Sequence, residues 1–136
     1  DPECQPLLMR LTGDLPAIML GAVRGRLNPA ALGQKPQTAL GVVLTAKGYP
    51  GAYPKGLPIT GIAEAEALPQ VKVFHSGTSL KEGQLLSTGG RVLCVTALGD
   101  DLAQAQKAAY AAVERIHMPD SFCRRDIGDK GLRRLG

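Results

Sequence analysis

The chain has 136 residues, of which 44% are hydrophobic, which predicts one small domain or a small domain joined to a piece of another. Its 16 basic and 12 acidic residues give a net charge of +4, but the basic excess crowds at the C-terminus without the interleaved aromatic residues typical of nucleic-acid sites. No apolar run approaches the ~20 residues that span a bilayer, so we expect a cytoplasmic chain without a signal peptide that binds neither nucleic acid nor membrane.

Cysteine and histidine positions argue against a disulfide framework and against a structural zinc site. Cys4, Cys94 and Cys123 are odd in number and far apart, with no CxxC pair and no histidine at ligand spacing. We therefore expect a reducing compartment, no metal bound by this chain, and Cys94 as a small hydrophobic residue of the core. His75 and His117 have no Ser or Cys partner nearby in the sequence, so neither is given a catalytic role.

The N-terminal part predicts two short helices followed by a linker. Asp1 is placed to cap the first helix. A second helix is expected from Asp14 to Arg24 or Arg26, because apolar residues recur along one side of it. Residues 28–37 combine two prolines with Asn, Gly and Gln, and this composition predicts the boundary between two structural units.

A strand and a long loop come next. The segment 38–48, TALGVVLTAKG, predicts a strand with both faces covered, because apolar residues occupy alternate positions on each side. Between residues 47 and 61, four glycines and three prolines exclude a regular element, and the Tyr and Lys side chains there favour an ordered functional loop over a floppy one. Residues 63–68, AEAEAL, are expected to form a helical turn.

From residue 71 the pattern predicts a β-meander, in which short turns join antiparallel neighbours. Its last two strands lie in residues 84–98, where QLLST leads through the Gly89-Gly90 turn into the apolar strand RVLCVTAL. Glycines there supply positive φ and let the backbone approach a neighbour or ligand closely. Arg91 follows them, and its guanidinium offers a planar set of donors to a phosphate or carboxylate. The competing interpretation of Arg91 is a solvated strand end.

The C-terminal part predicts one long amphipathic helix. Asp101 with Gln104 resembles a capping box, and apolar residues then recur at helical spacing to about Ile116. A last short helix is expected after residues 123–126. Two N-terminal helices, a linker and about four antiparallel strands backed by the long helix make an α+β chain.

Motifs that would carry out catalysis are missing from this sequence. It contains no glycine-rich phosphate loop before a helix, no HExxH, no GxSxG and no pair of carboxylates in an apolar setting. If the chain serves an enzyme, we expect it to be the part that anchors substrate, and we assign it no catalytic residue.

Four segments, in this order and spacing, closely resemble one family. They are DPECQPLL, AKGYPGAYPKGLPITG, VFHSGTSLKEGQLLSTGGRVLCVTA and CRRDIG. Together they resemble the C-terminal third of phosphoribosylamine–glycine ligase (glycinamide ribonucleotide synthetase), over nearly the whole chain and most weakly at 26–37 and around 63–70. The chain departs from the family pattern at Ala52, where an acidic residue is common, and at Cys94, where a small residue is usual.

The resemblance implies part of a cytoplasmic ATP-grasp enzyme that joins glycine to 5-phosphoribosylamine with ATP and Mg²⁺, through a glycyl phosphate, in de novo purine synthesis. Residues 1–27 would be the last helices of the ATP-grasp domain, 28–37 the linker, and 38–136 a small substrate-anchoring C-domain of the rudimentary hybrid-motif type. In the family, the strand whose Glu and Asn hold Mg²⁺ immediately precedes the DPExQ segment. We therefore expect this piece to be inactive alone, to bind no cofactor itself, and to need the N-terminal ATP-grasp portion as its partner.

The resemblance also implies which residues meet the substrate. Related ATP-grasp purine enzymes bind the ribosyl phosphate with an arginine in a Gly-rich turn, and the matching residues here are Gly89, Gly90 and Arg91. A weaker set, which either lines the same pocket or only orders the loop, is Lys47, Gly48 and Tyr49. Asp1 and Glu3 would help to place the amine or glycine, or else only cap the first helix. Arg124, Arg125 and Asp126 are expected to form a structural ion-pair cluster, with a substrate role as the alternative.

A different class of function is compatible with the same fold. The chain would then be a non-catalytic interaction domain that docks on another chain through the exposed apolar faces of its first two helices. Binding of a ribosyl phosphate at Arg91 separates the two hypotheses. A nucleic-acid-binding role would rest only on the C-terminal arginines.

Overall fold

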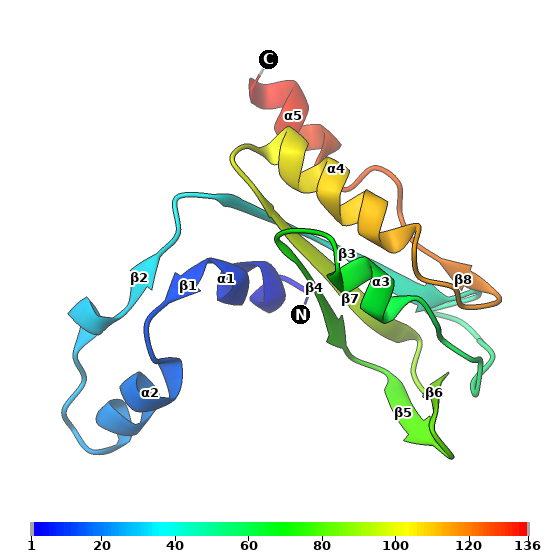
Figure 1. Ribbon diagram of the computed structural model, residues 1–136, viewed down its shortest axis with the longest axis horizontal. Helices are drawn as coiled ribbons and strands as arrows, with labels where there is room; N and C mark the ends of the chain where they lie inside the picture. The colour runs from blue at the N-terminus through cyan, green and yellow to red at the C-terminus, as the bar shows by residue number, and fades with distance from the viewer. Residues whose placement is uncertain (1, 136) are drawn as a thin grey trace.

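The structure is a computed structural model that describes residues 2–135 (Figure 1). Its helices are α1 (Cys4–Arg10), α2 (Leu15–Val23), the 3-10 turn η1 (Pro29–Ala31), α3 (Ile62–Glu66), α4 (Leu102–Val113) and α5 (Asp129–Leu135). Its strands are β1 (Leu11–Thr12), β2 (Gly33–Gln34), β3 (Thr38–Ala46), β4 (Val71–His75), β5 (Thr78–Lys81), β6 (Gln84–Ser87), β7 (Arg91–Gly99) and β8 (Ser121–Phe122). The predicted α+β class, with an antiparallel sheet and one long helix, is confirmed.

A four-stranded antiparallel sheet in the order β4-β7-β3-β8 forms the body of the molecule. β7 and β3 pair along their whole length, from Thr38 opposite Gly99 to Thr45 opposite Arg91. The register shifts once, because Leu44 lies opposite Leu93 and Thr45 lies opposite Arg91, which leaves Val92 as an extra residue in β7. This β-bulge is the irregularity on which the candidate site depends.

The inner face of the sheet, defined here as the face that α4 covers, contains the hydrophobic core. Alternate residues of the two long strands point into it, as the period of two in a strand requires. The buried residues that β3, β7 and α4 contribute include Leu40, Val42, Leu44, Leu93, Val95, Ala97, Ala105, Ala109 and Ala112. Aliphatic side chains of the strands fill this core, and the small alanines of α4 let that helix lie close to the sheet.

The outer face of the sheet, on the opposite side, is only partly covered. α1 crosses β3 and β7 there, and a Cβ on Gly41 would meet Pro6 Cγ at 3.1 Å and Cys94 Sγ at 3.2 Å. Cys94 is fully buried beneath this contact, as predicted, and burial raises the pKa of its thiol. Gly41, Val43 and Thr45 of β3 are only half-buried on this face.

The strands from residue 71 onward do not form the predicted meander. β5 and β6 form a two-stranded hairpin around a turn in which Glu82 and Gly83 have positive φ. On its other side β6 forms an isolated bridge to the preceding loop, between Leu86 and Pro58. β4 pairs instead with β7, so the strand that follows the hairpin returns to the main sheet. The predicted turn at residues 81–83 is confirmed, but the segment 71–80, expected as one strand, divides into β4 and β5, and the predicted order of neighbours is wrong.

Two helices begin at the expected caps, and the long helix ends before the predicted position. Asp14 accepts a hydrogen bond from the Ala17 N–H at 2.9 Å, and Asp101 accepts one from the Gln104 N–H at 2.8 Å. α1 ends at Arg10 because Leu11 and Thr12 pair with Gly33 and Gln34 inside the predicted linker. α4 ends at Val113, although Ile116 still packs in the core.

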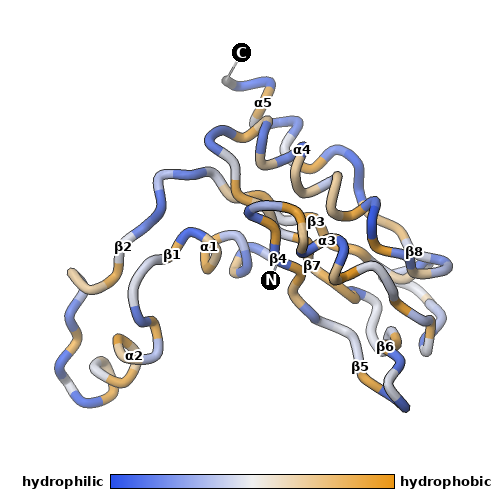
Figure 2. The backbone as a smooth tube through the Cα atoms, in the orientation of Figure 1, coloured by the Kyte–Doolittle hydropathy of each residue, from blue (hydrophilic) through white to orange (hydrophobic). Residues whose placement is uncertain are grey.

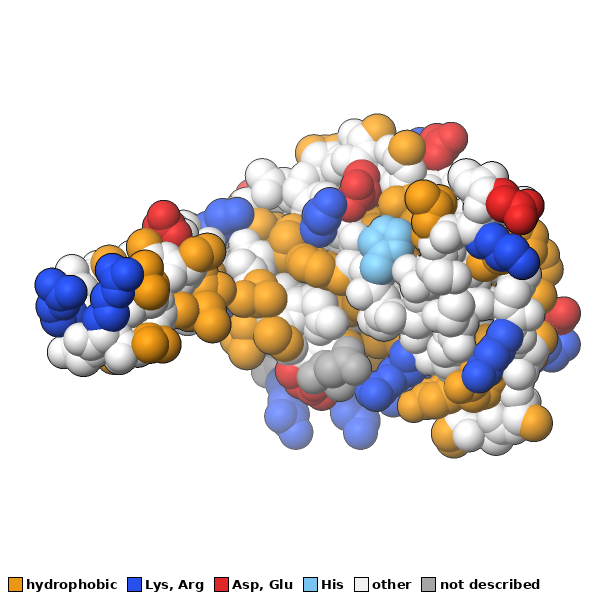
Figure 3. All heavy atoms as spheres, turned by 90° about the horizontal axis from the view of Figure 1, so that it is seen from below, with side chains coloured by type: hydrophobic (Ala, Val, Ile, Leu, Met, Phe, Trp, Pro, Cys, Tyr) orange, Lys and Arg blue, Asp and Glu red, His pale blue; other side chains and the backbone are white. Residues whose placement is uncertain are grey.

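Residues 11–34 form an arm that projects from the body of the molecule (Figures 1 and 2). α2 has no buried residue, and Figure 3 shows hydrophobic side chains over the projecting part. Among residues 2–135, no helix is long and apolar enough to cross a membrane.

Candidate anion-binding site

A hollow of about 320 Å³ opens on the outer face of the sheet, beside the N-terminal end of α1. β3 contributes its floor through Gly41, Val43 and Thr45. Around them stand two arginines and two aromatic side chains from three separate segments, namely Arg91, Arg124, Tyr49 and Phe122. An apolar floor beneath two guanidinium groups suits a ligand that carries both an anionic group and a less polar body.

The bulge at the start of β7 directs Arg91 into this hollow. In a regular antiparallel ladder, side chains of paired residues lie on the same face, and a slip of one residue moves a side chain to the other face. Because Val92 is the extra residue, Arg91 pairs with Thr45, whose side chain faces outward. Val92 itself is fully buried in the core. The sheet therefore places an exposed cation on the outer face at the edge of the hollow.

The Gly89-Gly90 turn is needed for close approach and not for positive φ. Neither glycine is among those with positive φ, in contrast to the expectation. A Cβ on Gly90 would overlap the Tyr49 ring, and a Cβ on Gly89 would lie 3.2 Å from Gly77 Cα. The absence of a side chain at Gly90 thus lets Tyr49 lie against the turn and line the hollow.

The residues before Tyr49 hold the loop in place. The Lys47 N–H donates to the Asp120 carbonyl at 2.7 Å, and the Tyr49 N–H donates to the Ala46 carbonyl at 3.2 Å. Gly48 has a φ of +99°, a conformation that glycine adopts without strain. Of the set Lys47, Gly48 and Tyr49, the structure brings only Tyr49 into the lining of the hollow. For the other two, the geometry supports loop ordering.

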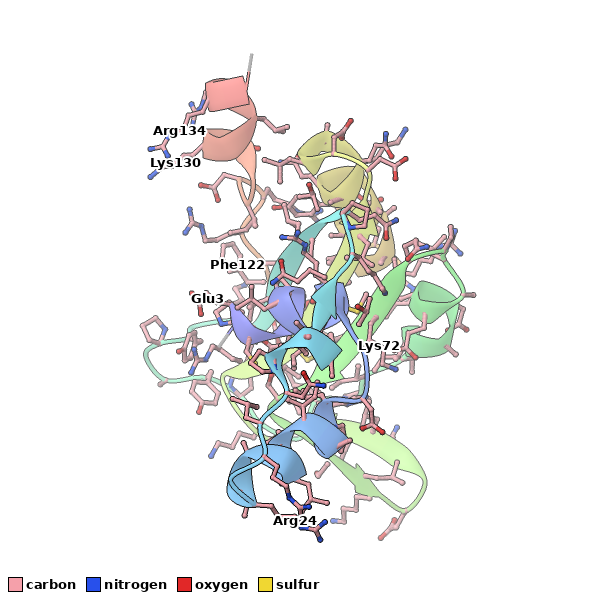
Figure 4. All side chains as sticks on the ribbon, turned by 90° about the vertical axis from the view of Figure 1, so that its left-hand side faces the viewer. Glu3, Arg24, Lys72, Phe122, Lys130 and Arg134 are labelled. Atoms are coloured by element: carbon pink, nitrogen blue, oxygen red, sulfur yellow. The ribbon has the colours of Figure 1, made fainter. Side chains whose placement is uncertain are left out.

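At the start of the chain, Glu3 precedes α1 as its N-cap residue, without a side-chain capping bond. The pKa of its carboxyl is lowered, mainly by a hydrogen bond from its own backbone N–H, and the charge of Arg91 is the smallest of the contributions. Pro2 lines the hollow, and Figure 4 shows Glu3 on the same side of the molecule as Phe122. Asp1 lies outside the described residues, so its predicted role stays a prediction.

The segment 124–127 also contributes to the hollow, through Arg124 and Ile127. The Arg124 guanidinium donates from Nε to Asp126 Oδ1 at 2.9 Å and from Nη2 to Asp126 Oδ2 at 2.6 Å. This contact raises the pKa of Arg124 and lowers that of Asp126. Arg125 turns away toward Glu114, with 3.7 Å between Nη1 and Oε1. The ion pairs that the sequence suggested are therefore present, but Arg124 also lines the hollow.

Within residues 2–135, no cluster of three or more His, Cys, Asp or Glu side chains is placed to hold a metal ion. His75 contacts Thr78, with 3.0 Å between Nδ1 and Oγ1, and His117 is joined to Thr60 by backbone hydrogen bonds. Neither histidine is among the residues that line the hollow.

Fold and site together define a small α+β domain with an open, cationic hollow on the outer face of an antiparallel sheet. The model of one family, described as "Phosphoribosylglycinamide synthetase, C domain", matches residues 39–130, which is more than half of the chain. The chain belongs to this family. The resemblance to the C-terminal part of phosphoribosylamine–glycine ligase is thereby confirmed.

Individual relatives agree with the family. The chain is 49% identical over 133 residues to a phosphoribosylamine–glycine ligase of Rhodopirellula baltica, covering 97% of this chain and 30% of that protein. It is 50% identical over 135 residues to a chloroplastic phosphoribosylamine–glycine ligase of Arabidopsis thaliana, covering 98% of this chain and 25% of that protein. The chain therefore spans about a third or less of the length of these curated relatives.

A solved structure gives the same result. The crystal structure of a phosphoribosylamine–glycine ligase from Thermotoga maritima matches with a TM-score of 0.68 and 33% identity. The match covers 81% of this chain and 26% of that one. The described residues thus have a fold similar to part of that ligase.

Proposed function

We propose that this chain is the C-domain portion of an ATP-dependent phosphoribosylamine–glycine ligase and that its hollow binds the ribosyl phosphate. In this proposal the remaining portion of the ligase supplies the ATP and Mg²⁺ chemistry that joins glycine to 5-phosphoribosylamine, and this chain alone is inactive. The names of the relatives support the reaction, and the shared C domain supports the division of labour.

The observation that carries the phosphate assignment is the position of Arg91 at the hollow. A phosphate monoester offers several acceptor oxygens, and a guanidinium can donate two parallel hydrogen bonds to it. Such a charge-assisted contact contributes on the order of 1.5–3 kcal/mol, which corresponds to roughly 10- to 100-fold in affinity. The apolar floor and Tyr49 provide a surface on which the ribose can lie.

The proposal is tested by calorimetric titration of the 136-residue chain with ribose 5-phosphate, with ribose as the control ligand. We expect Arg91→Ala to weaken binding about 10- to 100-fold while leaving the fold intact. Arg24→Ala removes the same charge from the arm, remote from Phe122 and the hollow in Figure 4, and should leave binding unchanged. Equal affinities for ribose 5-phosphate and ribose in the unaltered chain would reject the proposal.

The second candidate function is the interaction domain, favoured by one specific observation. Apolar side chains of the arm are exposed, including Met19 at 61% and Val23 at 85%. An interaction domain would associate through this surface and would show no saturable binding of ribose 5-phosphate. The same titration therefore distinguishes the two functions.

A further inference from the structure

We infer that Arg124 supplies a second cation to the phosphate site and that Tyr110 is the positioning residue that holds Arg124 there. The inference rests on the proposed function and deepens it, because it names the residues that complete the same site.

The two adjacent arginines face different hollows. Arg124 lines the outer hollow together with Arg91, whereas Arg125 lines a separate hollow with Leu44, Val113 and Glu114, beside α4. Both side chains are about equally exposed, at 64% and 65%. Position and not exposure thus separates them. Arg125 also lies over the Tyr110 ring, with its Cζ 5.8 Å from the ring centroid, whereas the Tyr110 hydroxyl bonds to the backbone of Arg124 and Ile127.

A hydroxyl group from α4 fixes the backbone of the segment that carries Arg124. Tyr110 Oη donates to the Arg124 carbonyl at 2.8 Å and accepts from the Ile127 N–H at 3.0 Å. Gln106 Nε2 donates to the Ile127 carbonyl at 2.8 Å. Burial raises the pKa of Tyr110, so the phenol stays protonated and continues to donate at neutral pH. The segment is therefore held at both ends by one side chain.

Asp126 orients the Arg124 guanidinium without using all its donors. The carboxylate takes the Nε–H and one Nη2–H, which leaves three of the five N–H groups for a ligand. Because Asp126 also offsets part of the positive charge, Arg124 should contribute less to binding than Arg91 does. A phosphate monoester carries a charge of about −1.5 to −2 at pH 7, so it can use a second cation where a singly charged carboxylate gains less.

The experiment is the ribose 5-phosphate titration of the same chain, with variants at these positions. We expect Arg124→Ala to weaken binding about 3- to 10-fold and Arg125→Ala to leave it within about twofold. Arg124→Lys keeps the charge but loses the fork of donors, so it should restore only part of the affinity. Thermal unfolding of each variant shows whether its fold is retained.

Tyr110→Phe removes the hydroxyl and keeps the ring. It should weaken binding in the unaltered chain and have no further effect in the Arg124→Ala background, because its effect acts through Arg124. A purely structural role would lower affinity equally in both backgrounds, and that result would overturn the positioning role.

The remaining outcomes separate this inference from the proposed function. If Arg91→Ala weakens binding and Arg124→Ala does not, the second cation is rejected while the phosphate site stands. Equal losses in Arg124→Ala and Arg125→Ala would indicate general charge attraction and would also reject it. If the unaltered chain does not bind ribose 5-phosphate, both the proposed function and this inference fall.

Discussion

At the level of single residues, the direction of Arg91 depends on one extra residue in β7. Without the bulge at Val92, Arg91 would lie opposite Ala46, which is fully buried on the inner face. Burying an unpaired guanidinium there would cost several kcal/mol, on the order of the penalty for an ion in a protein interior. The bulge avoids this cost by turning the cation toward the outer face.

Gly90→Ala tests the close contact between the turn and Tyr49. The added Cβ would overlap the Tyr49 ring, so we expect a loss of about 1–3 kcal/mol in the free energy of unfolding, or displacement of the ring from the hollow. Chemical denaturation measures the first effect, and the affinity for ribose 5-phosphate measures the second. In the Tyr49→Ala background the ring is gone, and Gly90→Ala should be nearly neutral. A cost that persists in that background would place the strain elsewhere.

The sequence predicted part of this site and could not predict the rest. The double glycine predicted close approach, and the structure contains it, but the expected positive φ is absent. The direction of Arg91 was not visible, because RVLCVTAL is apolar at nearly every position and such a run does not reveal a bulge. For Arg124 the sequence leaves an ion pair and a substrate role open, and the folded loop shows that it pairs with Asp126 and also lines the hollow.

At the level of elements, Glu66 joins α3 to the edge strand β4. Its Oε1 accepts from the Val73 N–H at 3.0 Å and lies 2.7 Å from Lys72 Nζ. Burial acts to raise the pKa of this carboxyl, but the hydrogen bonds from Lys72 and Val73 outweigh it, and the pKa is lowered. The ionised carboxylate therefore stabilises the fold.

The lowered pKa sets the direction of a pH effect. A depressed folded-state pKa gives stability that is present above the unfolded pKa, near 4.5, and is lost as the pH falls through the folded value. We expect Glu66→Gln to cost about 0.5–1 kcal/mol at pH 7 and progressively less below pH 4.5, as measured by urea denaturation at several pH values. Glu64→Gln on the same helix is the control. A difference between Glu66→Gln and the unaltered chain that grows on acidification would contradict this account.

The order of the strands was the main feature that sequence reasoning missed. Strand positions follow from apolar alternation and turn residues, which are local signals, and these predict β3, β6 and β7 but not the break between β4 and β5. Pairing between β4 and β7 skips the whole β5-β6 hairpin, and no local signal records it. Tertiary packing on α4 decides it, because both strands bury core residues against that helix.

At the level of the whole molecule, the exposed apolar side chains of the arm predict association. Met19 and Val23 are 61% and 85% exposed. We expect the chain to self-associate as its concentration rises, and Met19→Lys with Val23→Lys to suppress this in sedimentation velocity. Leu80→Lys is the control, because Leu80 is 73% exposed but lies on the β5-β6 hairpin and not on the arm. It should have little effect on self-association. If the chain sediments as a monomer at every concentration, the predicted association through the arm is wrong.

Family and fold class were accessible from the sequence because several motifs occur in register along the chain. The division at residues 28–37 stays a prediction. The structure shows that part of this stretch is β2, which pairs with β1, so the predicted linker contains ordered backbone. Local composition with prolines and a glycine did not distinguish such a paired segment from a free linker.

The most direct measurement of the central claim is the NMR signal of the Arg91 Nε–H group, assigned by its loss in Arg91→Lys. On titration with ribose 5-phosphate, we predict a saturable shift of this signal that ribose does not cause. If the signal does not move while the chain remains folded, the phosphorylated sugar is not held by Arg91, and the assignment of the hollow is wrong.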